Sequence, residues 1–132
     1  RMPFAVMVDG TLVGMSSYID IQRGNRALEI GTTYYRPSAR GGPVNPAAKR
    51  LLLDHAFACG ANRVAFKVDD RNGRSQAAMT KLGATREGLL RHDMITWTGH
   101  VRSSVVFSIL AEDWPEIRAR LDERLAAFGV SS

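Results

Sequence analysis

The chain passes from a strand to a helix at Tyr34-Tyr35-Arg36-Pro37-Ser38-Ala39-Arg40-Gly41-Gly42-Pro43-Val44-Asn45-Pro46. Asn45 can cap a helix with its side chain, and Pro46 suits the first helical position because its missing N–H would be unpaired there. Gly41 and Gly42 let the backbone approach a ligand closely. The free N–H groups at a helix start favour an anion, usually a phosphate. The stretch therefore predicts a strand, an anion-binding turn and a helix, with an ordinary well-capped connection as the alternative.

Two familiar phosphate-binding loops are excluded at this turn. A Walker A loop would end in Gly-Lys-Ser or Gly-Lys-Thr, which the turn lacks. A dinucleotide fingerprint would need a third glycine and an acidic residue at the end of the next strand, and both are missing.

The length of 132 residues predicts a single domain, 1–132, with a core of its own. No apolar run approaches the ~20 residues that span a bilayer, so no membrane segment is expected. The single cysteine, Cys59, rules out an internal disulfide, and it shows no ligand spacing with the histidines, so no metal is expected. A reducing, cytoplasmic location is the default expectation.

The net charge of +5 permits an acidic partner such as nucleic acid, the ribosome or a phosphorylated cofactor. The basic residues are scattered along the chain, so a solvated basic surface is the alternative interpretation.

The first third of the chain predicts three strands. Phe4–Val8 and Leu12–Ile21 flank Asp9-Gly10, a strong signal for a two-residue hairpin turn, and Ala27–Tyr35 follows. Strict alternation along the third strand predicts one core face, Leu28, Ile30, Thr32 and Tyr34. It predicts one cleft face, Glu29, Gly31, Thr33 and Tyr35. The alternative for Glu29 is a charge exposed on a strand.

The remaining elements alternate between helices and strands. They are a helix over Asn45–Cys59, a strand over Arg63–Val68, a helix over Ser75–Leu82, a hairpin over Thr85–Trp97 and Val101–Ile109, and a last helix that Asp113 caps. Asn72 is the expected cap of the second helix. The order is β-β-β-α-β-α-β-β-α. Because a crossover helix follows the third strand, one parallel pair is expected in an otherwise antiparallel sheet, in a mixed α/β fold.

Three segments together resemble the GNAT superfamily of acyl-CoA-dependent N-acyltransferases, and within it RimJ/RimL-type N-terminal protein acetyltransferases. The segments are Leu28-Glu29-Ile30-Gly31 through the Arg40-Gly41-Gly42 turn, Asn72-Gly73-Arg74-Ser75 with Lys81-Leu82-Gly83-Ala84, and Ser108-Ile109-Leu110 with Trp114-Pro115. Their order and spacing match over nearly all of the chain. The resemblance implies the GNAT fold.

The resemblance covers the back two-thirds of a typical member. The first strand and first two helices of the family have no counterpart here, so an N-terminal segment that helps to wall the acceptor pocket is expected to be missing. The turn also departs from the family pattern. Pro43 and Asn45 replace small residues, and Pro43 removes one N–H donor.

The resemblance implies transfer of an acetyl group from acetyl-CoA to a primary amine, with a protein N-terminus or a small amine as acceptor. It implies that the backbone of Thr33 and Tyr35 pairs with pantetheine. The pyrophosphate would be held by the turn Arg40, Gly41, Gly42, Pro43, Val44 and Asn45. Asn72 and Ser75 would lie beside the thioester.

The implied chemistry is direct attack of a neutral amine on the thioester in a ternary complex. Glu29 is the candidate base, because it is a carboxylate on the expected cleft face. Ser75, with Tyr35 behind it, is the candidate donor to the leaving thiolate. The alternative function is a non-catalytic basic module that binds nucleic acid or a CoA-like ligand, although the isolated Trp97 gives little sign of base stacking. An apolar sheet face left uncovered would favour a homodimer.

Overall fold

A computed structural model describes residues 1–129 of the chain. Its elements, in order, are β1 (Met2–Val8), β2 (Thr11–Gln22), β3 (Ala27–Tyr35), a 3-10 turn (Pro37–Ala39), α1 (Val44–Ala58), β4 (Arg63–Asp69), α2 (Gly73–Leu82), β5 (Thr85–Ile95), β6 (Val101–Leu110) and α3 (Trp114–Ala127). This order confirms the predicted mixed α/β fold. No helix within these residues is long and apolar enough to cross a membrane.

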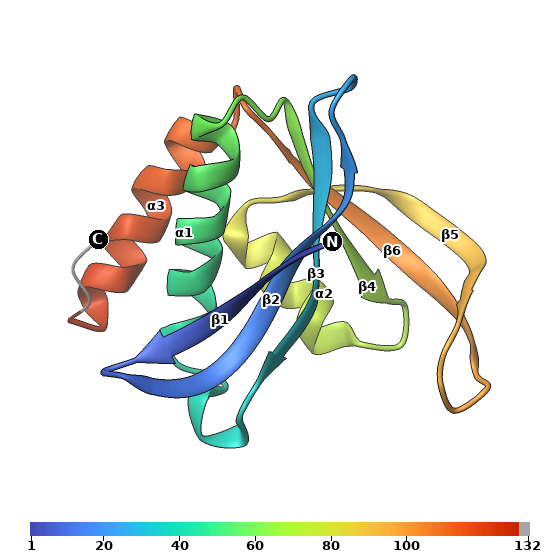
Figure 1. Ribbon diagram of the computed structural model, residues 1–132, viewed down its shortest axis with the longest axis horizontal. Helices are drawn as coiled ribbons and strands as arrows, with labels where there is room; N and C mark the ends of the chain where they lie inside the picture. Colours follow the sequence, from blue (N-terminus) through green and yellow to red (C-terminus); the bar gives the residue numbers. More distant parts are fainter. Residues whose placement is uncertain (130–132) are drawn as a thin grey trace.

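The six strands form one sheet in the order β1-β2-β3-β4-β6-β5. Every neighbouring pair is antiparallel except β3 and β4, which are parallel as the crossover helix α1 predicts. Figure 1 shows the sheet with α1 and α3 packed side by side and α2 beside the strands. The sheet is therefore assembled from two antiparallel groups, β1-β2-β3 and β4-β6-β5, that meet at one parallel contact.

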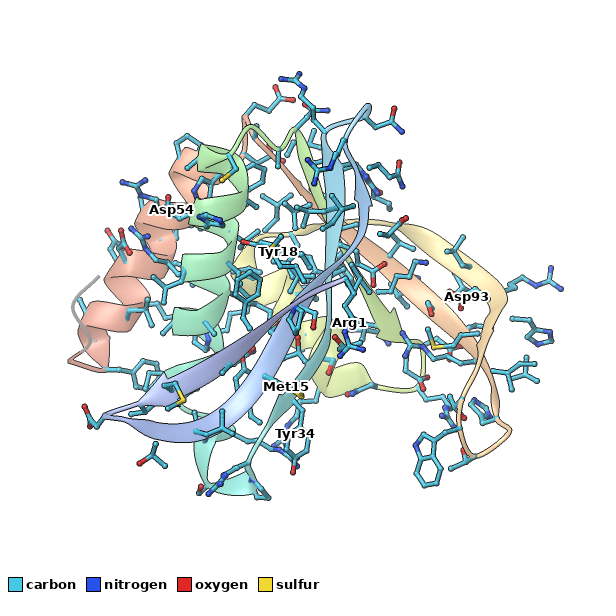
Figure 2. All side chains as sticks on the ribbon, viewed as in Figure 1. Arg1, Met15, Tyr18, Tyr34, Asp54 and Asp93 are labelled. Atoms are coloured by element: carbon cyan, nitrogen blue, oxygen red, sulfur yellow. The ribbon has the colours of Figure 1, made fainter. Side chains whose placement is uncertain are left out.

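All three helices contribute to a single core on one face of the sheet. Its buried members are Tyr18, Ile30, Leu53, Ala56, Val64, Phe66, Met79, Leu82, Val105, Phe107, Ile109, Trp114, Ile117 and Leu121. Figure 2 shows Tyr18 between the sheet and α1, where its hydroxyl donates to the Leu52 carbonyl. The Trp114 indole donates to Asp54 at 3.2 Å and joins α3 to α1. The core therefore fixes the helices to one side.

The opposite side of the sheet, here called the open face, is covered by none of the helices in residues 1–129. Directly paired residues share a face, so the register assigns the members of the open face on both strand groups. They include Ala5, Met15, Ser17, Ile19, Glu29, Gly31, Tyr34, Ala65, Lys67 and Val106.

A bulge in β3 overturns the strict alternation that the sequence predicts. Ser17 lies opposite Gly31 and Met15 opposite Tyr34, so β3 has one residue more than β2 in this interval. Thr32 takes up the extra residue with a φ of 48°. Beyond it the faces exchange: Tyr34 is 54% exposed and Tyr35 is buried on the helix side. The predictions that Tyr34 faces the core and Tyr35 the cleft are therefore wrong.

Two helix starts also differ from the prediction. Pro43 already has near-helical φ and ψ of −79° and −11°, so α1 begins at Val44 and Pro43 is its N-cap residue. Asn45 does not cap the helix; its side-chain oxygen accepts from the Lys49 ammonium one turn later. Asp113 likewise makes no side-chain cap to α3, because its carboxylate accepts the Leu110 N–H at 3.1 Å.

The predicted start of α2 is two residues late, whereas its predicted cap is confirmed. The helix begins at Gly73, and the Asn72 side chain accepts the Ser75 N–H at 3.1 Å. Gly83 ends it with a φ of 98°, the left-handed conformation that glycine adopts at low cost.

A glycine in β2 permits the close packing of β2 on β3. A Cβ atom added to Gly14 would lie 2.3 Å from the Tyr34 carbonyl oxygen and 2.6 Å from a ring atom of Tyr35. Backbone cannot yield as the end of a flexible side chain can, so a larger residue would push the two strands apart.

We predict that Gly14→Ala lowers the free energy of unfolding by about 1–3 kcal/mol, the usual cost of overpacking. Gly24→Ala is the matched control, because a Cβ there meets no atom within 4 Å. Urea unfolding followed by circular dichroism measures both. Equal stabilities of the two variants would contradict the packing argument.

Candidate functional site

The parting of β3 from β4 is the main irregularity of the sheet. The two strands pair over three residue pairs, from Ala27–Arg63 to Glu29–Ala65, although both continue well beyond them. Further along, β3 stays with β2, and β4 stays with β6 as far as Asp69. The edge of β3 from Ile30 onward therefore turns away from β4, and its backbone can accept an extended ligand there.

The turn after β3 is held by the side chain of Arg40. Its Nε donates to the Tyr35 carbonyl at 2.9 Å, and its guanidinium lies 5.4 Å from the centre of the Tyr34 ring. Gly41 follows with a φ of 79°, in the left-handed region. This conformation turns the chain into α1.

The start of α1 carries backbone N–H groups suited to an anion. The first amides of an α-helix have no partner within the helix, and here they belong to Val44 and Asn45. Pro43 and Pro46 contribute none, since proline has no N–H. The helix start therefore offers two N–H donors where an α-helix usually offers four, with Gly41 and Gly42 immediately before it.

The start of α2 lies at the end of β4, on the helix side of the parting. Asn72 is engaged as the cap, and Ser75 is half-buried in the first turn. Arg71 donates to Asp69 at 3.0 Å and fixes the preceding turn. The prediction that Thr33 shares the cleft face with Glu29 is wrong, because the bulge at Thr32 turns it to the helix side, where its hydroxyl lies 2.8 Å from that of Ser16.

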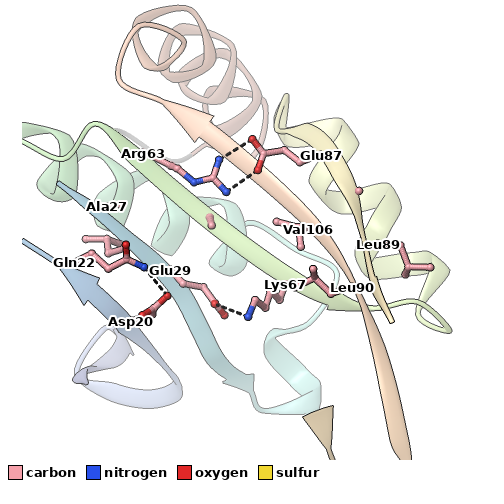
Figure 3. Close-up of a pocket in the computed structure, with 13 residues that line it drawn as sticks. Asp20, Gln22, Ala27, Glu29, Arg63, Lys67, Glu87, Leu89, Leu90 and Val106 are labelled. Atoms are coloured by element: carbon pink, nitrogen blue, oxygen red, sulfur yellow. Dashed lines mark hydrogen bonds and ion pairs between the residues drawn. The ribbon is translucent and has the colours of Figure 1, made fainter. Parts of the chain in front are cut away.

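The open face carries a depression of about 490 Å³ where β3 and β4 begin to separate. Figure 3 shows its lining, with Glu29 and Lys67 facing each other and Arg63 paired with Glu87 at one end. The remaining lining is mixed: Asp20, Gln22, Ala27, Leu28, Ala65, Gly88, Leu89, Leu90 and Val106. The depression can therefore receive a group that is part polar and part apolar.

Glu29 is the carboxylate at the closed end of the parting, in the last residue pair between β3 and β4. Its side chain is 12% exposed. Burial raises its pKa above the ordinary value, the Lys67 charge opposes that rise, and the Asp20 charge adds to it. A carboxylate with a raised pKa in a depression accepts a proton more readily than an exposed one.

The structure separates the predicted site residues into two groups. Glu29 faces the open side, whereas Tyr35, Thr33 and Ser75 lie on the helix side. Burial raises the pKa of Tyr35 to about 12, so its phenol stays protonated at neutral pH. A ligand threaded through the parting would have Glu29 on one side and the other three on the opposite side.

Sequence reasoning missed the partners of Glu29. Lys67 on β4 forms an ion pair with Glu29, and Asp93 on β5 forms a second ion pair with the same lysine; both are far from Glu29 along the chain. The alternation of Lys67 with Phe66 and Val68 indicated that Lys67 leaves the core face. The bulged register that brings in Asp93 has no such signal. No set of three or more metal-ligand side chains occurs within residues 1–129.

Comparison with known proteins identifies a family. The model of the "Acetyltransferase (GNAT) domain" matches residues 1–85, which include the parting, the turn and the start of α2.

Individual relatives agree with the family match. The Bacillus subtilis (strain 168) protein named "Putative ribosomal N-acetyltransferase YdaF" is 32% identical over 110 residues, 83% of this chain and 59% of that protein. The crystal structure of a "putative acetyltransferase" from T. thermophilus is 44% identical, with a TM-score of 0.88, and covers 93% of this chain and 65% of that one. Mycobacterium smegmatis RimJ, solved with CoA-disulfide, is 31% identical with a TM-score of 0.82, and covers 96% and 59%. The chain thus spans about six-tenths of the length of these proteins.

The raised pKa of Glu29 makes a prediction about stability. The unfolded state loses the Glu29 proton near the ordinary value of 4.5, whereas the folded state keeps it to higher pH. The folded state therefore loses stability as the pH rises from that value through the folded pKa. We predict that Glu29→Gln gains stability relative to wild type between about pH 4 and pH 7. Calorimetric melting at both pH values measures this, and a gain that shrinks with rising pH would contradict it.

Proposed function

The chain belongs to the GNAT acetyltransferase family, and from that premise we propose that it transfers an acetyl group from acetyl-CoA to a primary amine. One observation carries the proposal: a carboxylate, Glu29, lies at the last residue pair before β3 and β4 separate. A thioester arm in the parting and an amine in the depression would meet beside this carboxylate.

The acetyl-CoA would be held in three places. Its pyrophosphate would bind at the turn from Arg40 to Asn45, where Gly41, Gly42, Val44 and Asn45 carry N–H groups. Its pantetheine would lie along the free edge of β3, past Thr33 and Tyr35. Its thioester would lie near Ser75, next to the Asn72 cap. The Arg40 side chain supports this site by holding the Tyr35 carbonyl.

The chemistry needs a proton taken from the attacking amine. A primary amine is mostly protonated at neutral pH, so a base must accept its proton directly or through water before the nitrogen attacks the thioester carbonyl. Glu29 is that base in our proposal. The tetrahedral intermediate then expels the CoA thiolate, which accepts a hydrogen bond from a hydroxyl on the helix side, Ser75 or Tyr35, and takes its proton from water. Holding amine and thioester together supplies much of the rate.

The acceptor in this proposal is a protein N-terminus or a small amine, and the location is the cytoplasm. The open face and the exposed apolar residues at both edges of the sheet support a homodimer as the working form.

The turn at the start of α1 makes a prediction about binding. Calorimetric titration should show acetyl-CoA binding that dephospho-CoA retains and that pantetheine loses, because pantetheine lacks the pyrophosphate. Pantetheine binding as tightly as acetyl-CoA would contradict the role of the turn. Binding of acetyl-CoA that falls steeply with salt, together with RNA binding and no turnover, would favour the non-catalytic module instead.

The proposed base makes a prediction about turnover. With a free N-terminal peptide or a small amine as acceptor, Glu29→Gln should lower kcat by about 10²–10⁴-fold, the usual contribution of a general base. The acetyl-CoA affinity of this variant should remain that of wild type, because the proposed contacts with acetyl-CoA do not include the Glu29 side chain. Release of free thiol measures the rate, and an N-formylated peptide is the matched acceptor control. Undiminished kcat in the variant would exclude Glu29 as the base.

A further inference from the structure

One lysine on the open face lies between two carboxylates that come from different strands. The Lys67 ammonium on β4 is 3.9 Å from a carboxylate oxygen of Glu29 on β3 and 4.0 Å from one of Asp93 on β5. These distances are too long for direct hydrogen bonds, so neither carboxylate holds the lysine alone. The two carboxylates are consequently no more than about 8 Å apart across one charge.

The two carboxylates differ in how firmly they are held. The Ser104 hydroxyl donates to Asp93 at 2.8 Å, and the Arg102 Nε donates to the Ser104 oxygen at 3.1 Å. Ser104 is fully buried, so this chain of contacts fixes Asp93 to β6. Among the ion pairs of residues 1–129, Glu29 has one partner, Lys67 at 3.9 Å. The protonation of Glu29 therefore depends on how close the Lys67 ammonium lies to it.

We infer that Lys67 is a positioning residue. Its ammonium lies between Glu29 and Asp93, and its position between them sets how readily Glu29 is ionised in the depression. The inference rests on the proposed function and extends it, because it assigns the tuning of the proposed base to a residue that acts through Glu29. The Lys67 charge favours the ionised form of Glu29, while Asp93 attracts the same ammonium toward β5.

The other charges around Glu29 do not replace Lys67. Asp20 on β2 and Asp93 on β5 both disfavour ionisation of Glu29, as does burial, while Arg102 on β6 favours it. Lys67 is the foremost of the two favourable charges, ahead of Arg102, in its effect on the Glu29 pKa. Lys67 is also one-third exposed, so its charge is partly screened by water.

The test is direct titration of Glu29 by carbon NMR of the chain labelled at glutamate. The five glutamates give five signals, and Glu29→Gln identifies the one that belongs to Glu29. Lys67→Met should raise the Glu29 pKa by about 0.5–1 unit, the low end of the effect of a nearby opposite charge because Lys67 is partly exposed. Asp93→Asn should lower it, because it removes a like charge and leaves Lys67 to Glu29 alone.

Three comparisons separate tuning from a merely structural role. Lys67→Arg should keep the Glu29 pKa close to that of wild type, since the charge remains. Lys81→Met is the control for net charge, because Lys81 is exposed on α2 at the other side of the sheet. If Lys67→Met moves the titration no further than Lys81→Met does, or if Lys67→Met and Asp93→Asn move it in the same direction, the inference is wrong.

The kinetic arm keeps this inference distinct from the proposed function. In an active chain, the acid limb of the kcat/KM profile should move to higher pH in Lys67→Met and to lower pH in Asp93→Asn, in step with the NMR titration. A chain that turns over no amine would refute the proposed function, yet the titration would still decide whether Lys67 controls Glu29. Opposite NMR shifts with an unmoved acid limb would show that Glu29 is tuned but is not the base.

Discussion

The short parallel contact between β3 and β4 is the constraint on which the rest of the site depends. Three residue pairs hold the two halves of the sheet together, and beyond them each strand follows its antiparallel neighbour. The bulge at Thr32 fits this arrangement, since an extra residue increases the local twist of a strand and bends it. The backbone edge that β3 exposes, the position of Glu29 at the closed end and the exchange of faces before Tyr35 all follow from the same local geometry.

The two faces of the sheet are stabilised by different physics. On the helix side, apolar burial fixes α1, α2 and α3, with contacts such as Trp114 to Asp54 at the seam between helices. On the open face, charged side chains from three strands meet, with Lys67 of β4 between Glu29 of β3 and Asp93 of β5. These contacts contribute little stability, because they are long and the lysine is one-third exposed to water. Their arrangement matters for the protonation of Glu29 instead.

The fold could be predicted from the sequence because its signals are local. Asp9-Gly10, the crossover helix and the glycine after α2 each determine an element or a connection from a few residues. The errors arose where one residue changes the register. A threonine gives no warning that it will adopt a positive φ, so the faces of Tyr34 and Tyr35 were exchanged. Pro43 extended α1 backward and displaced Asn45 from its expected cap. Lys67 and Asp93 could not be joined to Glu29, because their meeting depends on the order of strands and on a shifted register between β5 and β6.

The division of the sheet also has a consequence for how the protein opens. Within each group of three strands the antiparallel pairing is long, whereas the joint between the groups has only three residue pairs. Amide hydrogen exchange would therefore begin at the joint before either group unfolds. An extended molecule lying in the parting would act as an additional strand that fastens the groups together. Its binding would then raise the free energy of unfolding of the whole domain. Occupancy of the site would be measurable as slower exchange of amides distant from it.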